Sequence, residues 1–501
     1  MRSFGRRLSS LAAAWLDVPE GQGARAVRML ALVFLMSAAL SLMKAAQSGI
    51  FLAAYPRSAI PWAFAASSVL LASVSAVAVA FTQRLGTARL GSIALSWTAL
   101  AVLALRLLLA VQLPSEALSS AVPFAVYVVI EAASGVLVIQ VWAIASAATD
   151  ARSARRLLPI AGLGAGAAWT ISGLAVHPIV GVIGAEGLLL AAPVLLGLAW
   201  IVARAVARLD LDVRDRRGSR SARAPLGDAF RFVAKVPLLR MMALLSILAL
   251  VVEEVMDFHV MATARETLGD ADAISAFFGR YYAITSAIGM LLLAGPAARI
   301  LGALGATRAL IATPLVIAIA ALIATFVPGL AAAVVLRGVG RVLKQSLWSN
   351  AQEQMQTPLA HARRAQARAA VRGVLAPAGY AIAALALAAI PEHVDERWLA
   401  AIVLVLSVGM VIVIATAARP TYLAALERAV DERRLFLDAR RAPRLTPLDR
   451  DALMLLDREI RGADPARAML AAEVLGLTRE EIHVDRIALA LAHADPGVRE
   501  A

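Results

Sequence analysis

Long apolar stretches separated by short polar segments recur through the first 420 residues of the chain. A helix needs about 20 mostly apolar residues to cross a bilayer, and the stretches have that length. The pattern predicts an all-α, polytopic membrane protein with twelve transmembrane helices. The predicted spans are 27–53, 59–82, 90–112, 118–147, 157–181, 185–207, 238–263, 274–297, 304–327, 330–352, 367–390 and 397–418.

The charge of the connecting segments alternates along the chain. Arginine and lysine gather before the first span, after the even-numbered spans and in the central segment 208–235. Two of the intervening connections, 264–273 and 391–396, are short and acidic. Because positively charged loops remain on the cytoplasmic side, both termini are predicted to be cytoplasmic. Residues 1–26 then form a cytoplasmic leader and not a cleaved signal.

The composition agrees with a membrane protein. The chain has 501 residues, of which 60% are hydrophobic and 17% charged, with a mean hydropathy of +0.76. The net charge of +14 follows from arginine-rich loops, so we expect no nucleic-acid partner. The chain lacks cysteine, and its six histidines show no zinc-binding spacing. Without nucleophile or nucleotide-hydrolysis motifs, we expect neither enzyme activity nor a cofactor.

A loop motif of the first half of the chain recurs in the second half. The sequence LGTAR at 85–89 follows span 2, and LGATR at 304–308 follows span 8. This repeat predicts two six-helix halves, 27–207 and 238–418, joined by a cytoplasmic linker at 208–237. The architecture is similar to that of major facilitator transporters. Halves of this kind place a solute site near the midplane between them.

The charges that carry most information lie inside the predicted spans. Arg337, Arg341 and Lys344 share one face of a helix, because they are spaced i, i+4, i+7. One such charge costs about 2.5–3.5 kcal/mol at the bilayer centre. Span 7 supplies three carboxylates, on Glu253, Glu254 and Asp257. Two hypotheses remain open, namely an anionic solute held by the basic residues or static ion pairs that latch the two halves together.

Four stretches resemble the bacterial and plastid type of ATP/ADP translocase, the nucleotide transporter family. They are SLMKAAQSGIFLAAYPRSAIPWAF (41–64), IEAASGVLVIQVWAIASAATDARSARRLLPIAGLGAGA (130–167), VVEEVMDFHVMATARE (251–266) and LKQSLWSNAQEQMQTPLAHARRAQARAAVRG (343–373). The resemblance implies exchange or uptake of nucleotides by alternating access. Its charged positions correspond to Glu131, Glu254, Lys344 and Glu353. Gln47 and Ser48 stand where the family has a basic residue and Asp, which leaves a different anionic solute as an alternative.

The polar tail at 419–501 is predicted to be a cytoplasmic helical segment. Residues 420–441 have an amphipathic pattern, and the closing IALALAHADPGVREA resembles the turn of a HEAT repeat. Because single repeats cannot bury their apolar faces, we expect a longer array or a protein partner. The alternative is a short helical cap beneath the bundle.

The leading hypothesis is a transporter of an anionic, nucleotide-like solute in a bacterial inner membrane. Lys44, Arg337, Arg341 and Lys344 would bind the anion, while Glu131, Glu254 and Asp257 would bind counter-charge or pair with them. Proposed partners are therefore the solute, the lipid bilayer and a protein docked on the tail. The alternative hypothesis is a membrane scaffold or sensor that does not transport.

Overall fold

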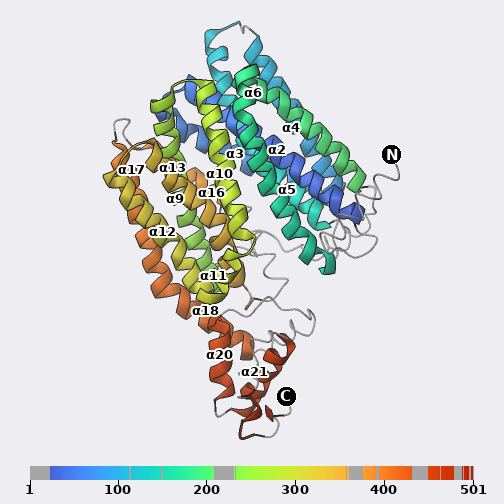
Figure 1. Ribbon diagram of the computed structural model, residues 1–501, viewed down its shortest axis with the longest axis vertical. Helices are drawn as coiled ribbons and strands as arrows, with labels where there is room; N and C mark the ends of the chain where they lie inside the picture. Colours follow the sequence, from blue (N-terminus) through green and yellow to red (C-terminus); the bar gives the residue numbers. More distant parts are fainter. Residues whose placement is uncertain are drawn as a thin grey trace.

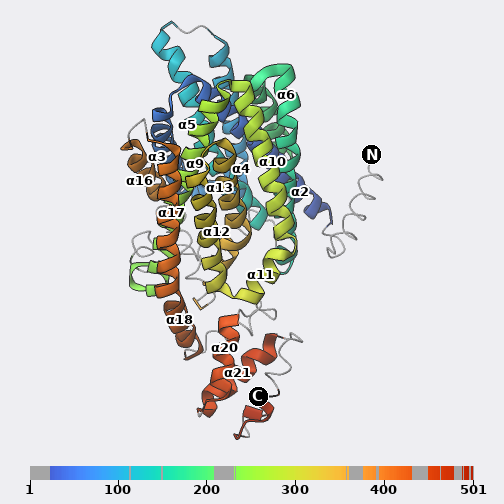
Figure 2. The ribbon, with the colours of Figure 1, turned by 60° about the vertical axis from the view of Figure 1, so that its left-hand side comes forward.

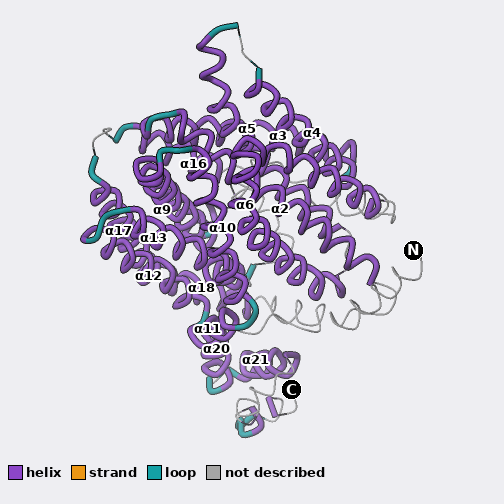
Figure 3. Tube along the Cα trace, turned by 45° about the horizontal axis from the view of Figure 1, so that its top comes forward, coloured by secondary structure: helices purple, strands orange, loops and turns teal. Residues whose placement is uncertain are grey.

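A computed structural model describes most of the chain, and all its regular elements within the described residues are helices (Figure 3). The described residues are 23–111, 114–147, 151–207, 231, 233–356, 358–359, 376–390, 394–431, 450–462, 464–478, 488, 490–495 and 498–499. Most of the predicted leader and of the predicted linker lies outside them, as does the first part of predicted span 11.

The N-terminal half consists of long helices joined by tight connections. They are α2 (Gly23–Ala54), α3 (Ile60–Leu85), α4 (Thr87–Ala110), α5 (Glu116–Ala147) and α6 (Ala151–Ala207). With 57 residues, a straight α6 would be roughly 85 Å long, far more than a bilayer requires. The chain instead reverses at Gly184, whose φ of 70° suits glycine, and α6 forms two arms (Figures 1 and 2). These arms match predicted spans 5 and 6.

The C-terminal half has shorter and more interrupted helices. They are α9 (Pro237–Leu268), α10 (Ala271–Leu293), α11 (Pro296–Leu304), α12 (Ala306–Phe326), α13 (Leu330–Leu343), α14 (Ser349–Gln354), α16 (Ala376–Ala388), α17 (Glu396–Val413) and α18 (Arg419–Asp431). A π-helical turn at Lys344–Trp348 joins α13 to α14, so predicted span 10 is one helical rod. Such turns are rare and frequently occur at functional sites.

One apolar core lies within the N-terminal half, and a second joins the C-terminal half to residues of α2, α3 and α5 such as Phe51, Phe64 and Tyr127. The two halves also meet along α10. Helix α10 packs against α2 and α6, while α16 packs against α3. Glycines allow this close approach: a Cβ at Gly279 would lie 2.9 Å from the carbonyl oxygen of Gly173. Asp272 of α10 also accepts a 2.6 Å hydrogen bond from Ala185 N, at the start of the second arm of α6. In Figure 1 the halves converge at the end opposite the C-terminal helices.

Within the described residues, eight helical stretches are long and apolar enough to cross a membrane by length and composition. They fall short of twelve because α6 counts once, α9 carries four carboxylates, the π-helical turn divides the rod of α13 and α14, and α16 is described only in part. Large apolar side chains such as Val182, Val405 and Trp97 are exposed on the outside of the bundle, as lipid contact requires. The protein is therefore an all-α polytopic membrane protein.

A small helical unit follows the membrane part. Helices α20 (Arg450–Ile460) and α21 (Pro465–Thr478) pack on each other and on α18, and α20 also touches α11 and α12. Leu456, Ile460 and Leu475 are buried in its core. Residues 479–487 lie outside the described residues, so the HEAT-like nature of the tail stays a prediction.

Candidate functional site

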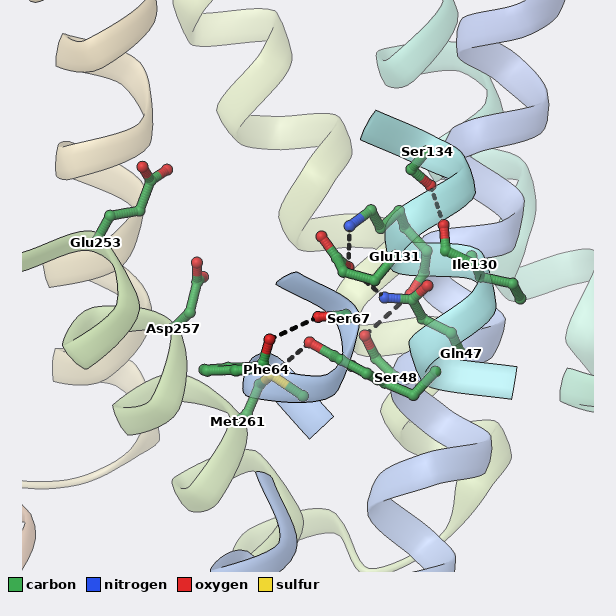
Figure 4. Close-up of polar contacts among 12 residues, drawn as sticks. Gln47, Ser48, Phe64, Ser67, Ile130, Glu131, Ser134, Glu253, Asp257 and Met261 are labelled. Atoms are coloured by element: carbon green, nitrogen blue, oxygen red, sulfur yellow. Dashed lines mark hydrogen bonds and ion pairs between the residues drawn. The ribbon is translucent and has the colours of Figure 1, made fainter. Parts of the chain in front are cut away.

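Arg337 of α13 forms the centre of a buried ion-pair cluster. Its Nε donates to Asp257 Oδ1, and its Nη2 donates to Asp257 Oδ2 at 2.8 Å and to Glu253 Oε1 at 3.2 Å. Asp257 and Glu253 lie one turn apart on α9 and point to the same side (Figure 4). Bidentate pairing of this kind is the geometry that a guanidinium and a carboxylate prefer. Arg337 is thus held by α9 in this structure.

Lys344 extends the same cluster by one further contact. Its ammonium group pairs with Glu253 Oε2, so Glu253 accepts from two cations of the rod that begins with α13. The Lys344 side chain is nevertheless 43% exposed, whereas that of Arg337 is 6% exposed. Because Lys344 points toward α9 and not toward lipid, this exposed surface indicates water access to the cluster from inside the protein.

The N-terminal half contains a smaller cluster between α2 and α5. Lys44 pairs with Glu131 Oε2, and Gln47 Nε2 donates to the same oxygen at 2.8 Å (Figure 4). The Glu131 side chain is 34% exposed. Gln47 is therefore a hydrogen-bond partner of a predicted site residue.

The two clusters have opposite arrangements of charge. In the N-terminal half the cation is on α2 and the acid on α5, whereas in the C-terminal half the acids are on α9 and the cations on the α13 rod. Each cluster lies within one half, and so does the 3.2 Å pair of Arg106 and Glu186. These ion pairs therefore do not connect the two halves. The hypothesis that they are static pairs latching the halves together does not hold for them.

Arg341 differs from its neighbours because it reaches across the boundary between the halves. Its guanidinium carbon lies 5.1 Å from the ring centre of Trp169 on α6 and 4.9 Å from that of Tyr282 on α10. Trp169 and Tyr282 also pack edge to face, with ring centres 5.3 Å apart. No carboxylate among the described residues pairs with Arg341, and its buried Nε has no hydrogen-bond partner there. Arg341 is thus the one of the four predicted cations for which the described residues show no ion pair.

Glu254 is the acidic counterpart of Arg341. Its Oε2 is buried, and within the part of the chain that the structure describes no group donates a hydrogen bond to it. Glu353 lies apart, near the end of α14, where it is exposed. Seven of the eight predicted site residues thus lie on α2, on α5, on α9 and on the rod from α13 to its π-helical turn. The eighth, Glu353, lies in α14, near the other end of that rod.

A second set of polar contacts joins the halves at the end away from α18. Arg57, between α2 and α3, pairs with Glu266 of α9 at 3.3 Å and donates to the carbonyl oxygen of Val394 at 3.1 Å. Arg265 donates to the carbonyl oxygen of Tyr55. These contacts border an open depression of about 670 Å³. We call the Arg57, Glu266, Arg265 and Tyr55 contacts the distal latch.

Sequence reasoning missed the aromatic groups and the distal latch. Trp169 lies in the glycine- and alanine-rich stretch GLGAGAAWTISG, where a lone large aromatic residue was the one available signal. Tyr282 follows another tyrosine in an ordinary apolar span and gives no such signal. Arg57 lies in a connection that the charge pattern treats as nearly neutral, so its contact with Glu266 became visible only in three dimensions.

Comparison with known proteins defines the fold. No protein-family description and no curated protein matches the chain in sequence. The solved nucleoside transporter NupG has a TM-score of 0.56 and 12% identity, over 78% of this chain and 98% of that one. A D-xylose-proton symporter has a TM-score of 0.55 and 12% identity, over 77% of this chain and 95% of that one. A POT family transporter in complex with 5-aminolevulinic acid has a TM-score of 0.54 and 12% identity, over 77% of this chain and 94% of that one. The chain therefore shares its fold with these solved structures.

Proposed function

We propose that this protein transports an anionic, nucleotide-like solute across a bacterial inner membrane by alternating access between its two six-helix halves. The single observation that carries the proposal is the position of Arg341, a cation at the boundary of the halves for which the described residues offer no carboxylate partner. The likeness to transporters of nucleosides, peptides and sugars supports the transport class.

Arg341 is suited to bind an anion that carries a flat ring. A guanidinium stacked on aromatic rings keeps its N–H donors free in its own plane, where they can grip phosphate or carboxylate oxygens. A buried donor without a partner costs about 1–3 kcal/mol, which an anionic ligand would offset. Trp169 and Tyr282 offer ring surfaces beside that anion. Phosphate recognition next to an aromatic surface favours a nucleotide-like solute over inorganic phosphate.

The paired cations have a supporting role in this proposal. Lys44, Arg337 and Lys344 hold the acids of α5 and α9, so they preserve the shape of the site when it is empty. Truncating one member of a buried pair leaves an uncompensated charge, and this would disturb the site without removing the residue that binds solute. We therefore assign solute binding first to Arg341.

The test is uptake into proteoliposomes of labelled ATP, ADP, nucleoside monophosphates and inorganic phosphate, with an uncharged nucleoside as the comparison. We expect saturable uptake of at least one nucleotide, and a loss of at least tenfold in Arg341→Ala with partial recovery in Arg341→Lys. The matched control is Arg280→Ala, which removes an exposed arginine of α10. Uptake that survives Arg341→Ala unchanged would refute the assignment.

The alternative is a non-transporting scaffold or sensor built on the transporter fold. It is favoured by the direct pairing of three of the four predicted cations and by the helical unit of α20 and α21 beneath the bundle. On this hypothesis no solute crosses the bilayer in the wild-type protein, and the tail retains a protein partner. Absence of uptake for every anion, from correctly folded protein, would favour it.

A further inference from the structure

Glu254 is a partly buried acid whose surroundings disfavour its negative charge. Its Oε2 is enclosed, and the described residues provide no hydrogen-bond donor for it. An ionised carboxylate in such a place is costly unless it is paired or hydrogen-bonded. Every other acid of the two clusters has a cation: Glu131 has Lys44, and Glu253 and Asp257 share Arg337. Glu254 is the exception.

The groups around Glu254 are mostly acidic. Those within electrostatic reach are Glu253 and Asp257 on its own helix, Glu131 and Tyr127 on α5, Arg337 on α13 and Tyr380 on α16. Lys44, Arg337 and Lys344 pair with these three carboxylates, so four acids, Glu254 included, face three cations, and the charge of Glu254 is the one left without a partner among the described residues. Like charges at such range favour protonation of one member of the set.

A proton is the cation that fits this place. Among the described residues no group of three or more acidic or histidine side chains is arranged to hold a metal ion. A proton needs one oxygen and a path to water. The partly exposed side chains of Asp257 (34%) and Lys344 (43%) indicate that water reaches the cluster. The proton would come from water on one side of the membrane and return to water on the other.

We propose that Glu254 binds a proton that crosses the membrane together with the anionic solute, so that the protein is an anion–proton symporter. The inference rests on the proposed function and names its coupling ion. Arg341 binds the anionic solute and Glu254 binds the proton. The described residues offer no ion-pair partner to either side chain. Protonation of Glu254 removes a negative charge from the neighbourhood of the incoming anion, so each cargo strengthens binding of the other.

The test uses liposomes that contain the full-length protein and a trapped pH-sensitive dye, with the nucleotide that gives the strongest uptake. In the wild type, we expect added solute to acidify the interior, and an acidic exterior to drive accumulation at least fivefold above equilibrium. Glu254→Gln imitates the protonated acid. We expect this variant to exchange labelled for unlabelled solute but to lose both proton movement and gradient-driven accumulation.

The controls separate failure of this inference from failure of the proposed function. Glu116→Gln, at the exposed start of α5, should keep coupled proton movement. Wild-type uptake without proton movement would overturn the inference but leave the transporter proposal standing. Proton-coupled uptake that persists in Glu254→Gln would have the same consequence. Absence of transport by the wild type would overturn both proposals. A melting temperature of Glu254→Gln no lower than that of the wild type verifies folding.

Discussion

The guanidinium carbon of Arg341 lies 5.1 Å from the ring centre of Trp169, so a cation of the C-terminal half rests on an aromatic ring of the N-terminal half. Lys44, Arg337 and Lys344 instead pair with acids of their own half. In the proposed alternating-access mechanism, movement of the halves relative to each other would change the contact of Arg341 with Trp169, and this contact would connect solute binding to that movement.

Replacing Trp169 tests the aromatic side of the site. A cation over an aromatic face contributes about 0.5–2 kcal/mol, equivalent to roughly 2- to 30-fold in a binding constant. We expect Trp169→Leu to raise the solute concentration for half-maximal uptake within that range and Trp169→Phe to raise it less. Trp97→Leu, an exposed tryptophan of α4, is the control and should leave it unaltered.

Removal of Arg57 should release the distal latch. Arg57→Ala deletes the contacts with Glu266 and Val394, and we expect the distal ends of the halves to separate more often. The chain has no cysteine, so spin labels can be placed on Leu118→Cys of α5 and Trp398→Cys of α17, both exposed. Pulsed electron resonance should show a larger fraction of long distances. Arg397→Ala, an exposed neighbour, should not change the distribution.

Gly279 should tolerate no side chain at the contact of α10 with α6. A Cβ there would approach Val176 to 2.5 Å and the carbonyl oxygen of Gly173 to 2.9 Å. We expect Gly279→Ala to cost about 1–3 kcal/mol by overpacking and to lower the melting temperature. Gly197→Ala, with no atom within 4 Å of its Cβ, is the comparison and should be neutral or slightly stabilising. Equal effects of the two substitutions would contradict the close packing of the halves at Gly279.

Arg337 should matter for stability more than Arg341. Arg337→Met leaves Asp257 without a cation, and breaking a buried pair in this way costs about 3–5 kcal/mol. We expect the melting temperature to fall clearly, and to recover in part when Asp257→Asn is added, because the isolated charge is then removed. Arg341→Met should cost less, since it breaks no ion pair among the described residues. The measurement is thermal unfolding in detergent.

The helical unit after α18 should depend on its apolar core and not on its surface charges. Leu456→Ala removes a side chain that is 2% exposed and should cost about 2–5 kcal/mol. Arg458 pairs with Glu427 at 2.7 Å, but it is 64% exposed, so Arg458→Ala should cost about 1 kcal/mol or less. Limited proteolysis should therefore cleave the tail faster in Leu456→Ala than in Arg458→Ala.

Local sequence patterns determined the helices and their faces. Apolar runs of membrane length predicted the spans, and the structure places helices over them, including the reversal at Gly184 between predicted spans 5 and 6. The i, i+4, i+7 spacing put Arg337, Arg341 and Lys344 on one face of the α13 rod. Both properties follow from the rise and the period of a helix, which depend on neighbouring residues alone.

The tertiary structure decided which charges are satisfied. Sequence spacing could not tell that Arg337 and Lys344 meet the acids of α9 while Arg341 meets the rings of Trp169 and Tyr282. It also could not single out Glu254 among the acids of α9. The physical reason is that pairing depends on the rotation and separation of packed helices, and these are set by contacts between residues far apart in the chain.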